Sequence, residues 1–271
     1  MDASAVSLNS ATMPGLGVPE LVDVATANSF GGIGLWRDAY AADGAVAAAR
    51  RTADAGLRIS SVCRAGMFPV DSPAQAAQVR DDNRRAVDEA HTLAAECLVI
   101  VCGAAPGRDL AGARRQVADG IAELAEYAAS AAIPLAVEPM HPMMIADRSV
   151  VTSLREAIDL IDNLVGPDIG GVGIALDAYH VWWDVRYPDE MQRLADRIHT
   201  VQISDWVTPI QHQLRSRGMP GEGVIDLRQF MAYVHATGYR GLVEVEVLSD
   251  AWQQRTPDDV VDAILTGIAD L

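Results

Sequence analysis

Short β-type runs alternate with alanine-rich segments of helical period along the whole of this 271-residue chain. Eight such runs stand out: Ala5–Leu8, Gly32–Trp36, Arg58–Cys63, Cys97–Cys102, Pro134–Glu138, Val172–Asp177, Ile198–Ser204 and Leu242–Leu248. Between them, apolar residues recur at i, i+3, i+4 and i+7, most clearly over residues 43–56, 110–130 and 153–164, as expected of helices that cover a sheet. Strands that alternate with helices in this way predict a parallel sheet with right-handed crossovers.

Eight strand–helix units in a chain of this length are typical of a single (β/α)8 barrel, the TIM barrel. A doubly wound sheet is the alternative, and it usually has a glycine-rich GxGxxG turn after its first strand. At that point residues 9–17 read NSATMPGLG and lack the motif. No change of composition, linker or short repeat divides the chain. We therefore expect an α/β protein whose residues 1–271 form one TIM-barrel domain.

The charge and composition of the chain exclude several classes of function. Hydrophobic residues make up 50% of the sequence, which suits a packed core, and the net charge is −16. Because an acidic surface repels phosphate backbones, we expect no nucleic-acid partner. All 21 basic residues are arginine. Without lysine, the chain can form neither a Schiff base nor a P-loop.

Cysteine usage and hydropathy bear on where the protein works. The cysteines Cys63, Cys97 and Cys102 form no CxxC motif, a pattern that suits a reducing compartment. The sequence has no apolar run of the roughly 18 residues that a membrane-spanning helix needs. Its first residues, MDASAVSLNSATM, lack a basic segment followed by an apolar one, so secretion is not expected either. These features predict a cytoplasmic protein that does not enter a membrane.

Polar side chains stand at the C-terminal ends of four consecutive predicted strands, where a TIM barrel builds its active site. They are Glu138, Asp177, Gln202 and Glu246. Three carboxylates and an amide oxygen form a hard, anionic set of ligands that suits Mn2+, Mg2+ or Co2+, of which we expect Mn2+ first. Any one of these residues could instead fill a barrel layer or cap a helix. Four together favour a divalent-metal site.

Other residues near the predicted strand ends could bind substrate or move protons. His141 follows Glu138 by three positions, and an imidazole pKa of about 6.5 suits acid–base catalysis at neutral pH. Arg37 and Arg64 also follow strands. They could clamp a carboxylate, a phosphate or sugar hydroxyls, although a single arginine at such a place more often forms a surface ion pair. Four tryptophans could form an aromatic wall against a sugar or simply close the barrel: Trp36, Trp182, Trp183 and Trp206.

Five motifs give the chain a family resemblance. They are VEP (137–139), LDAYH (176–180), VQISD (201–205), RGMPGEGVID (217–226) and EVEV (244–247). With these motifs the chain resembles the sugar isomerase/epimerase superfamily with a xylose-isomerase-like TIM barrel, over essentially its whole length. The resemblance implies that His180 and Arg217 contact the substrate. It also implies four metal ligands: Glu138, Asp177, Gln202 and Glu246.

Two ligand positions leave alternatives within this resemblance. Most members have histidine at the seventh-strand position, and Gln202 there resembles the pattern of hydroxypyruvate isomerases. On the eighth strand we expect Glu246 to be the ligand, because the family's ligand is the glutamate nearer to the strand's end. Glu244 is the alternative.

The resemblance implies a divalent-metal-dependent isomerase or epimerase that acts on a sugar or a keto-sugar. The sequence leaves the oligomeric state open, with a homo-oligomer as one of the options. Glu138 and Glu246 would move a proton next to a carbonyl, through an enediolate. The residues around His141 also resemble the catalytic subunits of C-glycoside deglycosidases, which are metal-dependent lyases of 3-oxo-glycosides; this alternative implies a small β-rich partner chain. A barrel that binds sugar without catalysis is the alternative from another class.

Overall fold

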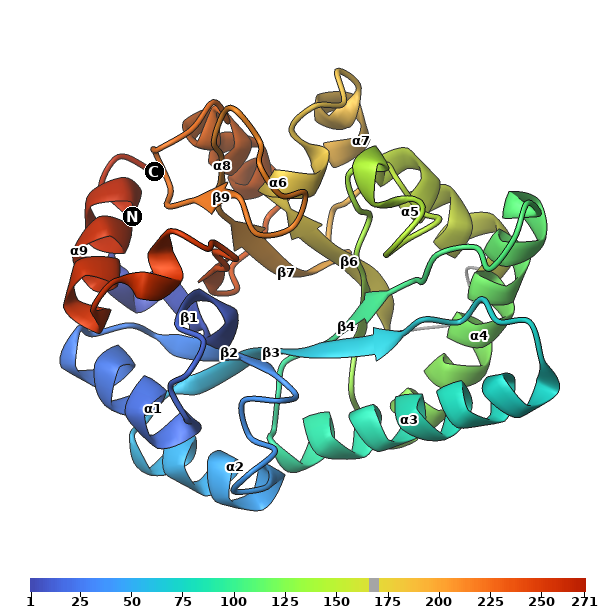
Figure 1. Cartoon of the computed structure of the whole chain (residues 1–271), viewed down its shortest axis with the longest axis horizontal. Helices are drawn as coiled ribbons and strands as arrows, with labels where there is room; N and C mark the ends of the chain where they lie inside the picture. Colours follow the sequence, from blue (N-terminus) through green and yellow to red (C-terminus); the bar gives the residue numbers. More distant parts are fainter. Residues whose placement is uncertain (166–170) are drawn as a thin grey trace.

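Eight parallel strands close into a barrel in the computed structural model of this protein, which describes residues 1–165 and 171–271 (Figure 1). Around the barrel the order is β1-β10-β7-β6-β5-β4-β3-β2, and pairing of β1 with β10 closes the ring. The strands are β1 (Val6–Asn9), β2 (Gly32–Trp36), β3 (Arg58–Gly66), β4 (Leu98–Val101), β5 (Leu135–Val137), β6 (Val172–Asp177), β7 (Ile198–Ile203) and β10 (Val243–Val245). The predicted TIM barrel is confirmed.

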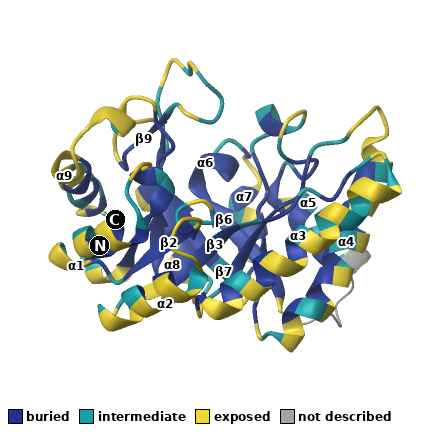
Figure 2. Cartoon of the chain, turned by 60° about the horizontal axis from the view of Figure 1, so that its bottom comes forward, coloured by how far each residue is buried: buried dark blue, intermediate teal, exposed yellow. Residues whose placement is uncertain are grey.

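Helices follow the strands and cover the outside of the barrel (Figure 2). They are α1 (Val18–Ala27), α2 (Ala45–Asp54), α3 (Pro73–Thr92), α4 (Leu110–Ser130), α5 (Leu154–Leu160), α6 (Ala178–Val181), α7 (Tyr187–Met191), α8 (Leu227–Ala236) and α9 (Pro257–Ile268). The predicted helical segments correspond to α2, α4 and α5, although α5 gives way after Leu160 to a π-helical turn, Ile161–Val165. Across residues 1–165 and 171–271, no helix combines the length and the apolar character needed to cross a membrane.

Several short elements complete the chain. Four 3-10 turns lie at Ala3–Ala5, Ser10–Thr12, Pro142–Met144 and Trp252–Gln254. Outside the barrel, β8 (Asp205–Trp206) and β9 (Arg217–Gly218) pair antiparallel, with Trp206 opposite Arg217. This pairing returns Arg217 to the C-terminal end of β7 after the intervening loop.

Alternation along the strands separates an outer core from the barrel interior. Leu98 and Ile100 of β4 belong to the large core that includes the helices, whereas Cys97 and Val99 belong to a small cluster inside the barrel. Ala136 of β5 and Ala175 of β6 are in the same inner cluster. Because side chains alternate with a period of two, residues 138 and 177 also face the barrel axis.

The register of the strands brings further polar residues to common levels. Asp177 of β6 is paired with Gln202 of β7, and Gln202 is paired with Glu244 of β10. Ser7 of β1 lies at the level of Glu244 on its other side. Glu246 is two residues beyond Glu244, and therefore lies one level nearer to the C-terminal end of the barrel.

Candidate active site

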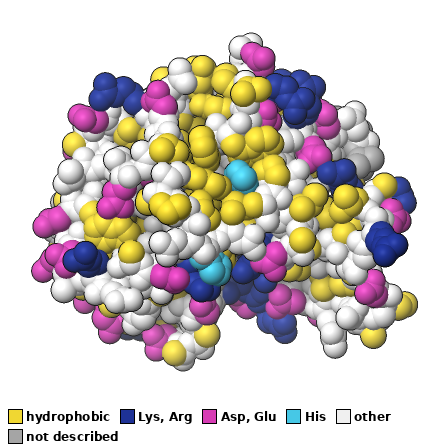
Figure 3. All heavy atoms as spheres, turned by 45° about the horizontal axis from the view of Figure 1, so that its top comes forward, with side chains coloured by type: hydrophobic (Ala, Val, Ile, Leu, Met, Phe, Trp, Pro, Cys, Tyr) yellow, Lys and Arg dark blue, Asp and Glu magenta, His cyan; other side chains and the backbone are white. Residues whose placement is uncertain are grey.

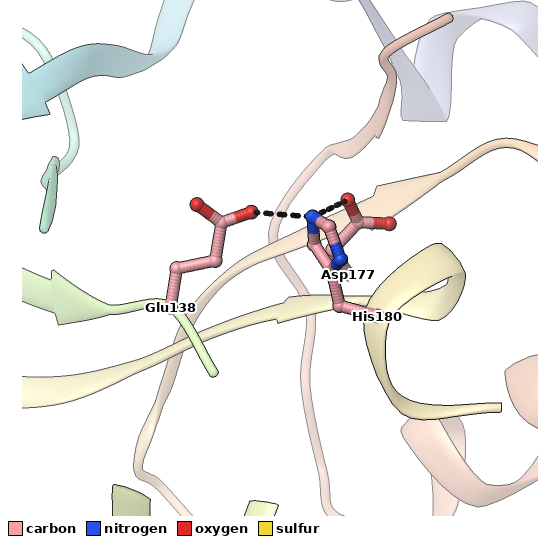
Figure 4. A group of neighbouring side chains, drawn as sticks. All are labelled: Glu138, Asp177 and His180. Atoms are coloured by element: carbon pink, nitrogen blue, oxygen red, sulfur yellow. Dashed lines mark ion pairs between the residues drawn. The ribbon is translucent and has the colours of Figure 1, made fainter. Parts of the chain in front are cut away.

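Three buried side chains meet where β5 and β6 end (Figure 4). Glu138 directly follows β5, and Asp177 ends β6 and caps α6 by accepting a hydrogen bond from the N–H of Tyr179 at 2.9 Å. His180 lies one turn further on α6, with its Nε2 3.7 Å from Oε1 of Glu138 and 3.7 Å from Oδ2 of Asp177. The potential ligand atoms of the three residues all lie within 4.8 Å of one another, so a single ion could contact them.

Arg217 joins Glu246 to this cluster. Its Nη1 donates to Oδ2 of Asp177 at 2.8 Å and to Oε2 of Glu246 at 3.3 Å. The guanidinium also lies over the ring of Tyr179, with Cζ 4.5 Å from the ring centroid. The other oxygen of Glu246, Oε1, accepts a hydrogen bond from the indole N–H of Trp36 at 2.9 Å. Glu246 therefore lies in the same buried centre as the two acidic residues from β5 and β6.

The amide nitrogen of Gln202 is hydrogen-bonded, whereas its amide oxygen is not. Its Nε2 donates to Oε1 of Glu244 at 3.0 Å, while its Oε1 is buried and has no hydrogen-bond partner among the described residues. Glu244 also accepts hydrogen bonds from Asn9, from Ser60 at 2.6 Å and from Ser61 at 2.9 Å. The carboxylate of Glu244 is thus occupied by the residues around it, which favours Glu246 as the eighth-strand ligand.

The acidic residues of this centre are buried close together, and their mutual repulsion disfavours the ionised forms. Burial, then the charges of Glu246 and Asp177, raise the pKa of Glu138 well above its ordinary value. Burial raises the pKa of Glu246 to about 7, although Arg217 opposes the shift. Like charges crowded in a low-dielectric site need a nearby cation. Together with the unused amide oxygen of Gln202, these oxygen donors fit a hard divalent ion.

Two histidines beside the centre are neutral at physiological pH. The backbone N–H of His141 donates to Nδ1 of His180 at 3.1 Å, and Nη2 of Arg217 lies 3.2 Å from Nε2 of the same ring. Nδ1 of His141 accepts the N–H of Met143 at 3.2 Å. Burial lowers the pKa of His141 to about 4 and the pKa of His180 well below its ordinary value. Because Nδ1 of His141 accepts a hydrogen bond, the neutral ring of His141 carries its proton on Nε2.

Aromatic rings line the approach to this centre. The ring of Trp206 lies 4.8 Å from Tyr179, 4.8 Å from His141 and 5.4 Å from Trp182, measured between centroids. The edge of Trp183 meets His141 at 5.6 Å. Trp182, a predicted substrate-binding residue, is half-buried in this group.

The structure does not bring Arg37 to the centre, although the sequence placed it among the substrate-binding residues. Its guanidinium donates to both carboxylate oxygens of Glu89 on α3, at 2.7 and 3.0 Å, and to Asp82 at 3.0 Å. The hydroxyl of Tyr40 donates to the same Glu89 at 2.8 Å. The donors of Arg37 are thus used to tie the segment after β2 to α3. Arg64 lies half-buried near the end of β3 and forms no ion pair within the described part of the chain.

Some residues of the centre escaped the sequence analysis. Asn9 ends β1 and donates to Glu244 and, at 3.3 Å, to Glu246; the same inspection of strand ends would have found it. Ser60 and Ser61 carried no such signal, because hydroxyl side chains are common within strands. Tyr179 follows Asp177 directly, but only the folded chain shows that its ring supports Arg217.

Comparison with known proteins places the fold in a family. A family model described as the xylose isomerase-like TIM barrel matches residues 22–265. A putative L-ribulose-5-phosphate 3-epimerase, SgbU, of Escherichia coli K12 is 27% identical over 222 residues, which cover 78% of this chain and 72% of that protein. A 3-dehydroshikimate dehydratase of Pseudomonas aeruginosa is 29% identical over 164 residues, or 58% of this chain. The matched region is 24% of that dehydratase, so the chain corresponds to about a quarter of its length.

Solved structures share the fold closely. Protein SMc04130 of Sinorhizobium meliloti 1021 is 40% identical and superposes with a TM-score of 0.94, covering 98% of both chains. The IolI protein, determined with a zinc atom, is 16% identical and superposes with a TM-score of 0.84, covering 98% of this chain and 97% of that one. The second likeness is one of fold alone.

Proposed function

The chain belongs to the family of xylose isomerase-like TIM barrels, and on this premise we propose that it is a divalent-metal-dependent isomerase or epimerase of a sugar or an oxidised sugar. The observation that carries the proposal is the buried cluster at the strand ends, in which Glu138, Asp177 and Glu246 lie around Arg217 and His180, while the buried amide oxygen of Gln202 has no partner among the described residues. The epimerase among the relatives supports the same class of reaction.

Four residues would hold the ion: Glu138, Asp177, Gln202 and Glu246. All four are buried and face the barrel axis, and their oxygens favour Mn2+, with Mg2+ or Co2+ as alternatives. A bound ion would act as a Lewis acid on the substrate's carbonyl and adjacent hydroxyl oxygens. The IolI protein, which has the same fold, was determined with a zinc atom, and this supports a divalent ion as the cofactor.

Glu138 and Glu246 are the proposed acid–base pair. They come from β5 and β10, which are three strands apart around the ring, so they approach the centre from different sides. A pKa of about 7 for Glu246 suits proton transfer at neutral pH. Returning the proton to the neighbouring carbon gives isomerisation, and returning it to the opposite face of the same carbon gives epimerisation. Each such transfer typically contributes about 10²–10⁴-fold to the rate.

Arg217 and His180 are the proposed substrate-binding residues. The guanidinium of Arg217 is buried between Asp177 and Glu246, and Nε2 of His180 lies 3.2 Å from Nη2 of Arg217 and 3.7 Å from Glu138 and Asp177. Hydrogen-bond donors fixed in this way stabilise the negative charge that develops on the substrate's oxygens as the proton leaves. Their positions are set before the substrate arrives, because Tyr179 supports Arg217 and the backbone of His141 orients His180.

Elimination from the same enediolate is the second candidate reaction. The relative from P. aeruginosa is a dehydratase, and the Nε2–H of a neutral His141 could donate a hydrogen bond to a leaving group. In this case the protein would be a lyase of 3-oxo-glycosides and would have a small β-rich partner. A barrel without catalysis is less favoured, because buried like charges reduce stability and are typical of functional sites.

Deuterium exchange tests the proposal directly. The Mn2+-loaded protein is incubated in D2O with free ketoses and, separately, with 3-oxo-glycosides, and the products are followed by mass spectrometry. We expect deuterium in a rearranged sugar, and we expect Glu246→Gln to abolish it. Glu126→Gln, on the exposed face of α4, is the matched control and should exchange like the wild type.

The outcomes separate the three readings. Release of an aglycone from the oxidised glycoside, without rearrangement of free sugars, would favour the lyase. Tight sugar binding to metal-free protein, with no exchange in either panel, would favour the non-catalytic barrel. Exchange that survives Glu246→Gln would remove that residue from the proposed mechanism.

A further inference from the structure

A permanently charged guanidinium lies inside the acidic centre. The side chain of Arg217 is only 2% exposed, and arginine does not give up its proton in proteins. Figure 3, in which α6 and β9 at the top of Figure 1 come forward, shows hydrophobic side chains gathered over the centre of this face. Water therefore screens the charge of Arg217 little, and its effect on a neighbouring ion is strong.

The guanidinium contacts one oxygen of each of two carboxylates. Nη1 of Arg217 donates to Oδ2 of Asp177 at 2.8 Å and to Oε2 of Glu246 at 3.3 Å. In the part of the chain that the structure describes, no other arginine lies within ion-pair distance of Asp177, Glu246 or Glu138. Arg217 is thus the side chain whose positive charge balances these acids.

The second oxygen of each carboxylate is engaged by a fixed donor. Oδ1 of Asp177 accepts the backbone N–H of Tyr179 at 2.9 Å, at the start of α6. Oε1 of Glu246 accepts the indole N–H of Trp36 at 2.9 Å. The oxygens that remain for an ion, Oδ2 of Asp177 and Oε2 of Glu246, are therefore the two that Arg217 contacts.

Arg217 is held at these oxygens through both its backbone and its side chain. Its backbone N–H donates to the carbonyl of Leu248 at 3.1 Å, and β9 pairs it opposite Trp206 of β8. Its guanidinium is supported by the ring of Tyr179. The positive charge is therefore fixed in the centre and does not withdraw freely when another cation approaches.

A buried carboxylate also folds the loop that follows Arg217. Asp205 is 1% exposed; its Oδ2 accepts the N–H of Gly221 at 3.1 Å, and its Oδ1 accepts the N–H of Ile225 at 3.0 Å. A Cβ at Gly223 would lie only 2.5 Å from Oδ1 of Asp205. The loop is thus closely packed around this carboxylate, and a large shift of Arg217 would disturb it.

From these contacts we infer that Arg217 competes with the divalent ion for Asp177 and Glu246, and thereby lowers the affinity of the centre for that ion. The inference rests on the proposed function, because it requires that the four proposed ligands hold a metal. Once an ion occupies Oδ2 and Oε2, Nη1 of Arg217 loses these acceptors and can donate to an oxygen of the substrate. One side chain would thus balance the acids first and bind the substrate afterwards.

Mn2+ titrations of two Arg217 variants test the competition. Arg217→Gln keeps a hydrogen-bond donor and removes the charge, so it should bind Mn2+ about tenfold more tightly than the wild type, or better. Arg217→Lys keeps the charge, and its affinity should stay within about threefold of the wild type. The affinities are measured by calorimetry at mildly alkaline pH, so that protons do not compete with the ion for its ligands.

Arg215→Gln is the matched control. It makes the same change of net charge two residues away, but Arg215 is paired with Asp250 and its side chain is 47% exposed. Its affinity for Mn2+ should therefore equal that of the wild type. If Arg217→Gln folds only with Mn2+, its affinity is measured from the dependence of its melting temperature on the Mn2+ concentration.

Two results would overturn the inference. Unchanged or weaker Mn2+ binding by Arg217→Gln would mean that the ion does not use the oxygens that Arg217 contacts. An equal gain in affinity by Arg217→Lys would mean that the size of the side chain, and not its charge, sets the affinity.

The titrations do not depend on turnover, so they separate this inference from the proposed function. Tighter Mn2+ binding by Arg217→Gln, in a protein that shows no deuterium exchange, would count against the proposed function alone. Exchange by the wild type, with unchanged Mn2+ affinity in Arg217→Gln, would count against the competition alone. Mn2+ binding by none of the proteins would overturn both.

Discussion

Gln202 and Glu244 form a pair in which one residue orients the other. Glu244 accepts the amide N–H of Gln202, which fixes the amide and leaves its buried oxygen without a hydrogen-bond partner among the described residues. Partners that orient a metal ligand in this way affect metal affinity almost as strongly as the ligand itself. A carboxylate in this position could equally hold an imidazole by its N–H.

We expect Gln202→His to retain metal binding and to change the metal preferred. Glu244 would orient the new imidazole, and nitrogen ligands suit zinc better than an amide oxygen does. The affinity for Zn2+ relative to Mn2+ should rise about tenfold. Competition titrations of the wild type and the variant measure this ratio. An unchanged ratio would mean that residue 202 does not contact the ion.

His141 should make the stability of the protein depend on pH. Its pKa is lowered from 6.5 to about 4 by burial, so below pH 6.5 the unfolded chain binds a proton that the folded chain does not. Stability is therefore highest above pH 6.5 and falls as the pH drops toward 4. His141→Asn keeps an acceptor for Met143 and removes the titration. When the pH is lowered from 7 to 5, we expect the melting temperature of the Mn2+-loaded wild type to fall further than that of the variant. Equal falls would contradict this account.

Single residues differ in how far the sequence reveals them. Glu138, Asp177 and Glu246 could be predicted because each follows or ends a strand of recognisable pattern, and the barrel brings all strand ends together. The partner of Arg37 could not be predicted from the sequence, because Glu89 lies 52 residues away on α3. Nothing local distinguishes an arginine that faces a substrate from one that faces a helix.

Among the elements, β2 and α3 are joined by the ion pairs of Arg37. Both carboxylate oxygens of Glu89 are used, and the side chain of Arg37 is only 21% exposed. Bidentate pairs of this kind are stronger than ordinary surface ion pairs. The tie lies outside the cluster of buried carboxylates, so its loss should affect folding and leave metal binding intact.

We expect Arg37→Met to lower the free energy of unfolding by about 1–2 kcal/mol and to leave the Mn2+ affinity unchanged. Thermal melting and calorimetric titration measure the two effects. Arg50→Met is the matched control, because Arg50 is 86% exposed and its pair with Asp54 is 3.8 Å long. A variant with wild-type melting and a raised KM would return Arg37 to the substrate site.

The bounds of the elements could be predicted more closely than their long-range contacts. The predicted runs Gly32–Trp36 and Val172–Asp177 coincide with β2 and β6. β3 instead continues beyond Cys63 to Gly66, because its register with β4 shifts between Cys63 and Ala65 and pairing resumes. Periodicity in the sequence marks where a strand can begin, but such irregularities are set by the neighbouring strand.

At the scale of the whole molecule, the buried acidic site reduces the free energy of unfolding. The buried acids repel one another, and burial raises the pKa of Glu138 and Glu246. A ligand that binds only the folded state stabilises it by about 2.7 kcal/mol at a concentration 100 times its Kd. We therefore expect Mn2+ to raise the melting temperature and a chelator to reverse the rise.

Glu138→Gln should separate stability from function. Because Glu138 must take up a proton or be buried as a charge when the metal-free chain folds, replacing it with an uncharged amide should raise the melting temperature by about 3 °C, the shift that roughly 1 kcal/mol gives in a chain of this size. The same change should abolish the stabilisation by Mn2+ and the exchange of deuterium. A lower melting temperature without metal would show that the carboxylates do not repel one another in the folded state.

The pairing of β1 with β10 has a consequence for how the molecule is made. Val6 of β1 is paired with Val243 of β10, so these two paired strands leave the ribosome more than two hundred residues apart. Until β10 has been synthesised, β1 and β7 are both edge strands with unpaired backbone groups, which is the state most prone to intermolecular pairing. The nascent chain therefore keeps β1 unpaired along one edge until β10 has been made, and chaperones have the most to protect in that interval.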